Sequence, residues 1–493
     1  MALAAGALVR GFLHLGEQYL NHLIAFKLLA SIRQKVFVAL CRLAPAKLEG
    51  RDKGNLIALV TTDVELIEVF YAHTISPVLI AFFVCLVLCV CLAVISPWLA
   101  LLAAVAYGVV GVLVPLAFQG RSAQAGREFR ELSGGLNSYV LDSLRGIRQS
   151  IQYGDGAVRL QQIKSRTESL AKSQSRLKRF EGLTAAVTTC VVTLFSGAML
   201  AASVWLFQAG TLSAEAVVIA TAVMMSSFGP VIALASLPGS LTHTFAAANR
   251  IFALMDEQPA VDAVKDGVDL PFSGMELRNV DFSYATADSI PDGRILSAFN
   301  LLLPPQRIIG ITGKSGSGKS TALKLLLRFW DPSAGEVLFS QHDITGINTS
   351  CLRQAQGYLT QDTQLFTGTI ASNIRIACPT ASLQDVEEAC RKASLHDFIA
   401  ALPDGYETQV GELGDRLSSG EKQRLGLARV FLHDAPMILL DEPTSNLDSL
   451  NEAVILRSLY HSARQKTVVL VSHRASTMRI AAEVFTVESG RVS

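Results

Sequence analysis

The amino-acid sequence predicts two domains of different class, an α-helical transmembrane domain followed by an α/β P-loop domain. Three observations lead to this prediction. The first half contains long runs without Asp, Glu, Lys or Arg, the second half alternates short apolar runs with helical patterns, and residues 313–320 read GKSGSGKS. Half of the 493 residues are hydrophobic and the mean hydropathy is +0.37, which is too apolar for an ordinary soluble protein.

The charge and cysteine content narrow the class of protein. The net charge of +1 combines an apolar first half bearing basic loops with a second half of mixed polarity, so it gives no reason to expect nucleic-acid binding. The cysteines lack the paired spacing of a zinc site and are predicted to be free thiols. These are Cys41, Cys85, Cys89, Cys91, Cys190, Cys351, Cys378 and Cys390.

Five membrane spans are predicted in the first half. Four runs carry no charged residue and are long enough to cross a bilayer core of roughly 30 Å as helices. Residues 1–32, which precede these four runs, form the fifth predicted span. Ionisable side chains interrupt this segment, but it is otherwise apolar and prone to form a helix. The four uncharged runs are residues 74–96, 97–119, 183–207 and 216–240.

Ionisable residues follow one face of the first predicted span. Arg10, His14 and Glu17 are spaced so that a helix brings them to the same side. Each such group costs about 2.5 to 3.5 kcal/mol on membrane-insertion scales, so this face should meet protein or a watery cavity. Contact with a substrate and a structural pairing of Arg with Glu are both consistent with the pattern.

The loops set the orientation. The loop after the first span carries six Lys or Arg residues and the loop after the third carries twelve, whereas the other two turns carry none. Both basic loops are therefore predicted to be cytoplasmic, with Met1 outside and the second domain inside. Each loop is expected to form paired helices joined by a short crossing helix, near residues 53–60 and 146–153; a solvated charged hairpin is the alternative. Pro230 and Pro238 are expected to kink the last span.

The second domain is predicted to begin after a polar linker at residues 256–274, which separates a membrane domain at 1–255 from a domain at 275–493. The 313–320 loop lies between an apolar run and a helical pattern, the setting of a phosphate-binding loop. Its glycines let backbone N–H groups surround an anion and Lys319 adds a positive charge. Ser320 is placed to bind Mg²⁺. The alternative is a Gly/Ser-rich turn that only connects a strand to a helix.

Further residues strengthen the prediction of a nucleotide site. The apolar run 437–440 ends in Asp441 and Glu442, one carboxylate for Mg²⁺ and one that can accept a proton from water. His473 follows another apolar run. Tyr284 is an aromatic residue that could stack on adenine, and Gln361 lies in YLTQDTQLF. Taken singly, each of these residues could equally belong to the core, a turn or a helix cap.

The order of these motifs resembles the ATP-binding cassette (ABC) family over essentially the whole chain. The resemblance implies that Gln361 is the Q-loop residue and a metal ligand, Asp441 the Walker B carboxylate, Glu442 the general base and His473 the switch histidine. It also implies a D-loop at 445–448 containing Asp448, and a segment at 411–416, GELGDR, that senses the crossing helices. The nucleotide-binding residues would be Tyr284, Gly313, Lys314, Ser315, Gly316, Ser317, Gly318, Lys319, Ser320 and Thr321. The signature, which completes the partner's ATP site, would be Leu417, Ser418, Ser419, Gly420 and Glu421.

The same resemblance implies an exporter half-transporter that uses ATP and Mg²⁺ in a bacterial inner membrane, with its cassette in the cytoplasm. It would act with a second half-transporter, identical or different, on a small solute, with the lipid bilayer as its other partner and no nucleic acid. Such halves have six helices, so the first helix is expected to be missing here, and the chain ends earlier than relatives. Ser419 replaces a signature glycine, which would weaken the site it completes.

Residues 10–48 and 54–71 are similar to subunits of bacterial heterodimeric thiol exporters linked to cytochrome bd assembly, which export cysteine or glutathione. Three alternatives stay open at this point. They are an exporter of lipid, peptide or drug-like molecules, a supporting subunit that does not hydrolyse ATP, and a soluble cassette ATPase acting on ribosomes or DNA. The uncharged spans argue against the last.

Overall fold

The computed structural model describes residues 2–235, 238–284, 294–411, 414–462, 464–488 and 490–492. It divides into two compact units. The first contains Met1–Arg42 and Gly50–Glu257, and the second contains Leu43–Glu49 and Gln258–Ser493. Among the predicted positions, Met1, Ser493 and the Glu412 and Leu413 of GELGDR lie outside the described residues.

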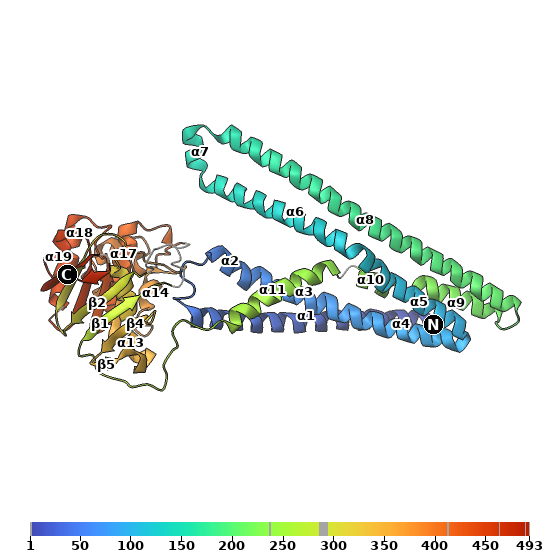
Figure 1. Ribbon diagram of the computed structural model, residues 1–493, viewed down its shortest axis with the longest axis horizontal. Coiled ribbons are helices and arrows are strands. Elements are labelled where there is room, and N and C mark those ends of the chain that lie inside the picture. Colours follow the sequence, from blue (N-terminus) through green and yellow to red (C-terminus); the bar gives the residue numbers. More distant parts are fainter. Residues whose placement is uncertain are drawn as a thin grey trace. The chain divides into compact units, whose positions relative to one another are not determined.

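The described part of the first unit is entirely helical (Figure 1). Its elements are α1 (Ala2–Leu43), α2 (Lys53–Ala58), η1 (Leu59–Asp63), α3 (Val64–Phe70), η2 (Tyr71–Ile75), α4 (Ser76–Ile95), α5 (Pro97–Gly108), η3 (Val109–Leu113), α6 (Val114–Arg145), α7 (Ile147–Tyr153), α8 (Gly156–Gln208), α9 (Ala214–Ser226), α10 (Gly229–Ala235) and α11 (Pro238–Asp256).

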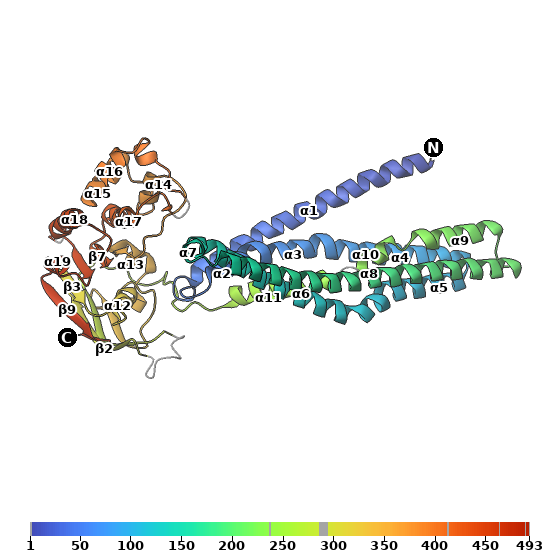
Figure 2. The same cartoon turned by 90° about the horizontal axis from the view of Figure 1, so that it is seen from above.

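Four described helical stretches are long and apolar enough to cross a membrane: Ser76–Ile95, Pro97–Phe118, Gly156–Gln208 and Ala214–Leu234. They contain most of the four uncharged runs, which confirms those spans. The predicted span at residues 1–32 lies within α1 and is not among the four, so it stays a prediction. Figure 2 shows α1 leaving the other helices of its unit toward its N-terminal end. Its apolar side chains there, such as Phe12 and Leu13, are exposed.

The four spans enclose a small apolar core. Leu99 and Ala103 of α5 are fully buried together with Met199 of α8 and Met224 of α9. A polar contact lies within it, because the Tyr107 hydroxyl donates a hydrogen bond to Ser227 Oγ at 2.7 Å. Outward-facing residues of the same helices are large and apolar, as suits a lipid environment in which the helix satisfies its own backbone groups.

The second basic loop has the predicted form. Helices α6 and α8 run side by side and α7 joins their ends (Figure 1). Arg176 on α8 donates to Glu128 on α6 at 2.8 Å, and the Arg166 guanidinium lies over the Tyr139 ring at 4.7 Å. The crossing helix expected near residues 146–153 is therefore confirmed as α7, Ile147–Tyr153.

The prediction of a crossing helix near residues 53–60 is wrong. Those residues form α2 and the start of η1, which continue directly into α3 as the returning helix. Asp52 begins this helix, since its side chain accepts a hydrogen bond from Gly54 N at 2.7 Å. The chain instead turns at residues 44–50, where Gly50 has a left-handed backbone (φ 85°). Residues Leu43–Glu49 belong to the second unit.

The last helix of the first unit is held by an ion pair and by hydrogen bonds to backbone carbonyl oxygens at its C-terminal end. Arg250 on α11 forms a two-pronged contact with Asp63, at 2.8 and 2.5 Å, and the Asp63 side chain is buried. Arg42 donates to the carbonyl oxygens of Met255 and Glu257 at 2.8 and 2.9 Å. Pro230 and Pro238 occupy the first turns of α10 and α11, where a missing backbone N–H costs nothing. Residues 236 and 237 of the last predicted span lie outside the described residues, so a kink of that span stays a prediction.

The second unit combines two sheets. Strands β1 (Met275–Phe282), β2 (Leu296–Leu303), β4 (Ala334–Phe339) and β5 (His342–Asp343) form an antiparallel sheet in the order β2-β1-β4-β5. The other sheet has the order β10-β9-β3-β8-β7-β6 and is parallel except for β10. Its strands are β3 (Ile308–Thr312), β6 (Gln356–Leu359), β7 (Met437–Asp441), β8 (Thr467–Val471), β9 (Glu483–Glu488) and β10 (Arg491–Val492).

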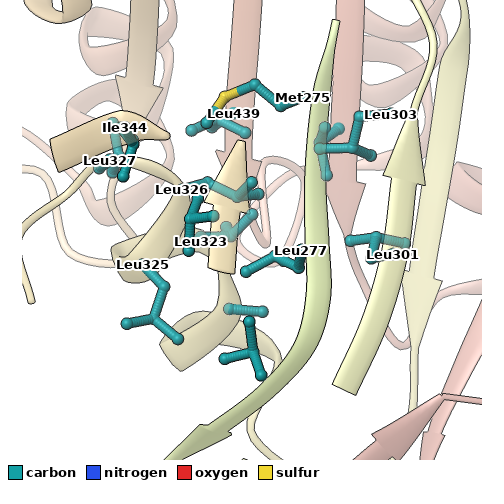
Figure 3. Packing of buried hydrophobic residues seen from close by; sticks show 14 of the residues in the cluster. Met275, Leu277, Leu301, Leu303, Leu323, Leu325, Leu326, Leu327, Ile344 and Leu439 are labelled. Atoms are coloured by element: carbon teal, nitrogen blue, oxygen red, sulfur yellow. The ribbon is translucent and has the colours of Figure 1, made fainter. Parts of the chain in front are cut away.

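Helices cover these sheets. The longer ones are α12 (Lys319–Leu326), α15 (Leu383–Lys392), α17 (Ser419–His433) and α18 (Ser449–Ser462). The shorter ones are η4 (Ile344–Gly346), α13 (Thr349–Ala355), α14 (Ile370–Arg375), α16 (His396–Ala400), η5 (Gly405–Glu407) and α19 (Ala475–Met478). Figure 3 shows Leu323 and Leu326 of α12 gathered with Leu277 of β1 and Leu439 of β7, so α12 packs against both sheets. The alternating order confirms the predicted α/β domain, and all eight cysteines are free thiols.

We expect Phe299→Ala to destabilise the second unit by about 3–5 kcal/mol, because Phe299 on β2 is fully buried in its core. Leu302→Ala on the same strand is the matched control, since the Leu302 side chain is 56% exposed and should change stability by less than about 0.5 kcal/mol. Thermal unfolding of the purified protein in detergent measures both. Equal midpoints for the two variants would contradict the described core.

Candidate nucleotide-binding site

The 313–320 loop joins β3 to α12 and depends on glycine at two positions. Gly313 has φ 147° and Gly318 has φ 104°, in a region that other residues rarely adopt. A Cβ on Gly313 would lie 2.3 Å from the Val487 carbonyl oxygen, and one on Gly318 would lie 2.6 Å from a Leu296 methyl group. Around Gly316 the space is open. The loop is thus closely packed at its ends and accessible at its centre.

Lys319 holds the loop in shape. Its side chain is largely buried, and Nζ donates hydrogen bonds to the carbonyl oxygens of Gly313 at 3.0 Å and Lys314 at 2.7 Å. Ser317 Oγ is buried with no hydrogen-bond partner among the described residues. A buried cation and an unpaired hydroxyl in a glycine-rich loop fit a phosphate group.

Asp441 ends β7 as a buried carboxylate. Burial raises its pKa above the ordinary value, as does the neighbouring Glu442, while a hydrogen bond with Ser320 and the charge of Lys319 oppose the shift. A carboxylate held out of water beside a serine hydroxyl is a donor set that fits Mg²⁺, which prefers such oxygen ligands. Gln361 lies on the wall of the same cavity.

Glu442 has an unusual backbone conformation for a residue with a side chain, with φ 50°. Its N–H donates to the Val471 carbonyl of β8 at 2.9 Å, and its carbonyl accepts a hydrogen bond from Gln423 Nε2 at 2.6 Å. Its carboxylate oxygen Oε1 lies 3.2 Å from Nδ1 of His473. Strands β7 and β8 are adjacent, so their ends bring Glu442 and His473 together.

A cavity of about 500 Å³ gathers most of the predicted site. The predicted residues on its wall are Gly313, Ser315, Gly316, Gly318, Lys319, Ser320, Thr321, Gln361, Asp441, Glu442 and His473. Ile295 also lines it and was missed by sequence reasoning, because nothing in its local pattern distinguishes it. Its position follows from sheet pairing, since its N–H donates to the Phe282 carbonyl at 2.8 Å.

Tyr284 does not line this cavity. Its hydroxyl lies 3.3 Å from Thr321 Oγ1 on α12, and its ring meets Phe282 and Trp330 edge-on, at 4.9 and 5.5 Å between centroids. It is anchored next to the phosphate loop, and stacking on adenine stays a prediction. Lys314 and Ser317 lie in the loop without lining the cavity.

The signature residues 417–421 and Asp448 also lie off the cavity wall. Ser418 and Glu421 form a capping box at the start of α17: Ser418 Oγ accepts from Glu421 N at 3.3 Å, and Glu421 Oε2 accepts from Ser418 N at 2.8 Å. Glutamate at this position therefore stabilises the helix start. The added Ser419 side chain is exposed, whereas a Cβ on Gly420 would lie 2.9 Å from the Asn446 carbonyl oxygen.

Three polar residues that sequence reasoning missed fix the loop after Glu442. Arg474 donates to the Ser445 and Leu447 carbonyl oxygens at 2.9 and 3.3 Å, and to Glu452 at 3.0 Å. Gln423 contacts the same loop from α17. Glu452 and Gln423 are distinguished by their burial, which the sequence alone does not reveal.

The glycine-rich loop faces a buried Asp441 and a partly exposed Glu442 at the end of one strand, with His473 beside them, and this arrangement defines a P-loop ATPase, here in a chain with a helical membrane unit. The chain matches the description "ABC transporter" over residues 296–445 and "ABC transporter transmembrane region" over residues 1–231. It therefore belongs to the ABC transporter family. It is an exporter-type half-transporter, a multi-pass membrane protein whose ATPase is coupled to transport.

Individual relatives have varied descriptions. The chain is 45% identical over its full length to a "Probable ABC transporter ATP-binding/permease protein" of Haemophilus influenzae, covering 88% of that protein. It is 32% identical to the "Mitochondrial potassium channel ATP-binding subunit" of Rattus norvegicus, over 98% of this chain and 68% of that protein. The chain is also similar to the solved "Structure of a bacterial Atm1-family ABC exporter with ATP bound", with TM-score 0.82 and 26% sequence identity. The match covers 95% of this chain and 82% of the chain in that structure.

We expect Lys319→Ala to weaken ATP binding by roughly 10- to 100-fold, because charge-assisted hydrogen bonds contribute about 1.5–3 kcal/mol each. Equilibrium binding of a fluorescent ATP analogue measures this. Lys314→Ala is the control: its side chain is exposed in the same loop, and we expect less than about a threefold change. Unchanged affinity in Lys319→Ala would contradict the role of this lysine.

Proposed function

We propose that the chain hydrolyses ATP together with a second half-transporter and exports a small solute, with cysteine or glutathione as the favoured substrate. The observation that carries the catalytic part is the gathering of Lys319, Asp441, Glu442 and His473 around one cavity. Phosphoryl transfer needs mainly positioning and charge stabilisation, and these residues supply a cation, a metal-binding carboxylate and a base.

Each residue has a separate proposed role. The N–H groups of the 313–320 loop and Lys319 would bind the phosphates, and Ser320, Asp441 and Gln361 would hold Mg²⁺, which when bound neutralises phosphate charge. Glu442 would accept a proton from the attacking water. His473, 3.2 Å from Glu442 Oε1, would keep that carboxylate in place and approach the terminal phosphate.

The proposed site is shared between two chains. Residues 417–421 do not line this chain's own cavity, which is in keeping with a role at the partner's ATP. The partner could be a second copy or a different chain. Because Ser419 adds an exposed side chain in the signature, the site that this signature completes would be the slower of the two. The presence of Glu442 argues against a subunit that does not hydrolyse ATP.

The substrate proposal rests on the first helix and its resemblance to the thiol exporters. In α1, Nδ1 of His14 lies 3.5 Å from Glu17 Oε2, and Arg10 lies one turn earlier. Both signs of charge on one helix suit a zwitterionic solute better than an apolar one. A relative covering half of this chain is described as "ATP-dependent lipid A-core flippase", from Syntrophus aciditrophicus, which keeps a lipid as the second candidate.

Glu442→Gln should abolish steady-state ATP hydrolysis, at least about 100-fold, while ATP affinity stays within about threefold, because the amide keeps the shape but cannot accept the proton. The measurement uses the purified complex of both half-transporters. Near-normal turnover in this variant would refute the assignment of the base.

Inside-out membrane vesicles containing the chain and its partner test the substrate. We expect ATP-dependent uptake of labelled cysteine or glutathione that disappears in Glu442→Gln vesicles. ATP hydrolysis without thiol uptake would reject the thiol proposal and retain the exporter. Uptake of a labelled lipid instead would favour the second candidate.

A further inference from the structure

The backbone of Glu442 needs support, because its left-handed conformation is uncommon for a residue with a side chain. Its N–H is satisfied within the sheet by Val471. Its carbonyl oxygen accepts hydrogen bonds from Ser445, through N at 3.3 Å and Oγ at 3.2 Å, and a shorter one from Gln423 at 2.6 Å. Of these donors, Gln423 comes from a separate helix, α17.

Gln423 is built into this position. It is 2% exposed and lies on the face of α17 that also carries the buried apolar residues Leu427 and Val430. Each end of its amide is engaged: Nε2 donates to Glu442 O and Ser445 Oγ, and Oε1 accepts from Asn446 N at 3.2 Å. Water has no access to replace these contacts if the amide is removed.

We propose that Gln423 is a positioning residue for ATP hydrolysis, whose amide holds the Glu442 backbone so that the carboxylate stays beside His473. The proposal rests on the role of Glu442 given above. Gln423 does not line the cavity, so it would act through Glu442.

The test is single-turnover hydrolysis of labelled ATP by the complete transporter carrying Gln423→Met, which keeps the size of the side chain and removes its donor. We expect about a tenfold lower hydrolysis rate with ATP affinity changed less than about threefold. Gln356→Met is the matched control, because Gln356 is also a buried glutamine donating to a backbone carbonyl, that of Leu326 at 2.8 Å, away from Glu442. It should keep the rate within about twofold.

A double-mutant cycle separates positioning from a general structural effect. In the Glu442→Gln background the substitution Gln423→Met should leave the residual rate unchanged, because the group it positions no longer acts as a base. The same tenfold loss in both backgrounds, a wild-type rate in Gln423→Met, or an equal loss in Gln356→Met would each overturn the proposal.

Two further results keep the test decisive. Gln423→Leu also removes the donor to Glu442 and keeps an apolar side chain at this buried position, so the same rate loss is expected if Gln423→Met does not fold. If Glu442→Gln alone retains normal turnover, the assignment of the base fails. If it abolishes turnover while both Gln423 variants hydrolyse normally, the positioning role alone fails.

Discussion

The parallel pairing of β3, β8 and β7 is the constraint on which the rest of the site depends. In register, Ile311 pairs with Val471 and Val471 with Asp441, so the three strands end at one edge of the sheet. Whatever follows each strand must then meet there: the phosphate loop after β3, Glu442 after β7 and His473 after β8. All five residues in each of β7 and β8 are buried, which makes this register costly to shift, because a one-residue slip would exchange the side chains between two closely packed faces.

The sequence predicts those site residues whose charge and local pattern indicate their chemistry. Lys319, Asp441 and Glu442 were found because a cation in a glycine-rich loop and two carboxylates after an apolar strand are arrangements that suit phosphate and metal binding and little else. Ile295, Gln423 and Arg474 were not found, since an isoleucine, a glutamine and an arginine are common and only tertiary packing gives these three their positions. For a residue that acts by holding the backbone, the residue type in the sequence therefore says little about its role.

In the membrane half, too, the sequence predicts the features with strong local signals and misses those that depend on weak ones. Uncharged runs predicted four spans, because lack of charge over such a length has one physical meaning. The position of a turn depends on smaller signals. Asp52 caps a helix and Gly50 has a left-handed backbone, so the chain turns before the crossing helix that was expected at 53–60. Ion pairs such as that of Asp63 with Arg250 join residues far apart in sequence and were beyond local pattern reading.

The membership of Leu43–Glu49 in the second unit means that the nucleotide-binding body is not one continuous stretch of chain. Ala46 packs against its core, and Glu49 pairs with Lys324, whose ammonium lies 5.1 Å from the Trp330 ring. During synthesis these seven residues leave the ribosome long before the sheet they join. A fragment beginning at the linker would therefore lack the ion pair of Glu49 with Lys324 and the packing of Ala46 against the core.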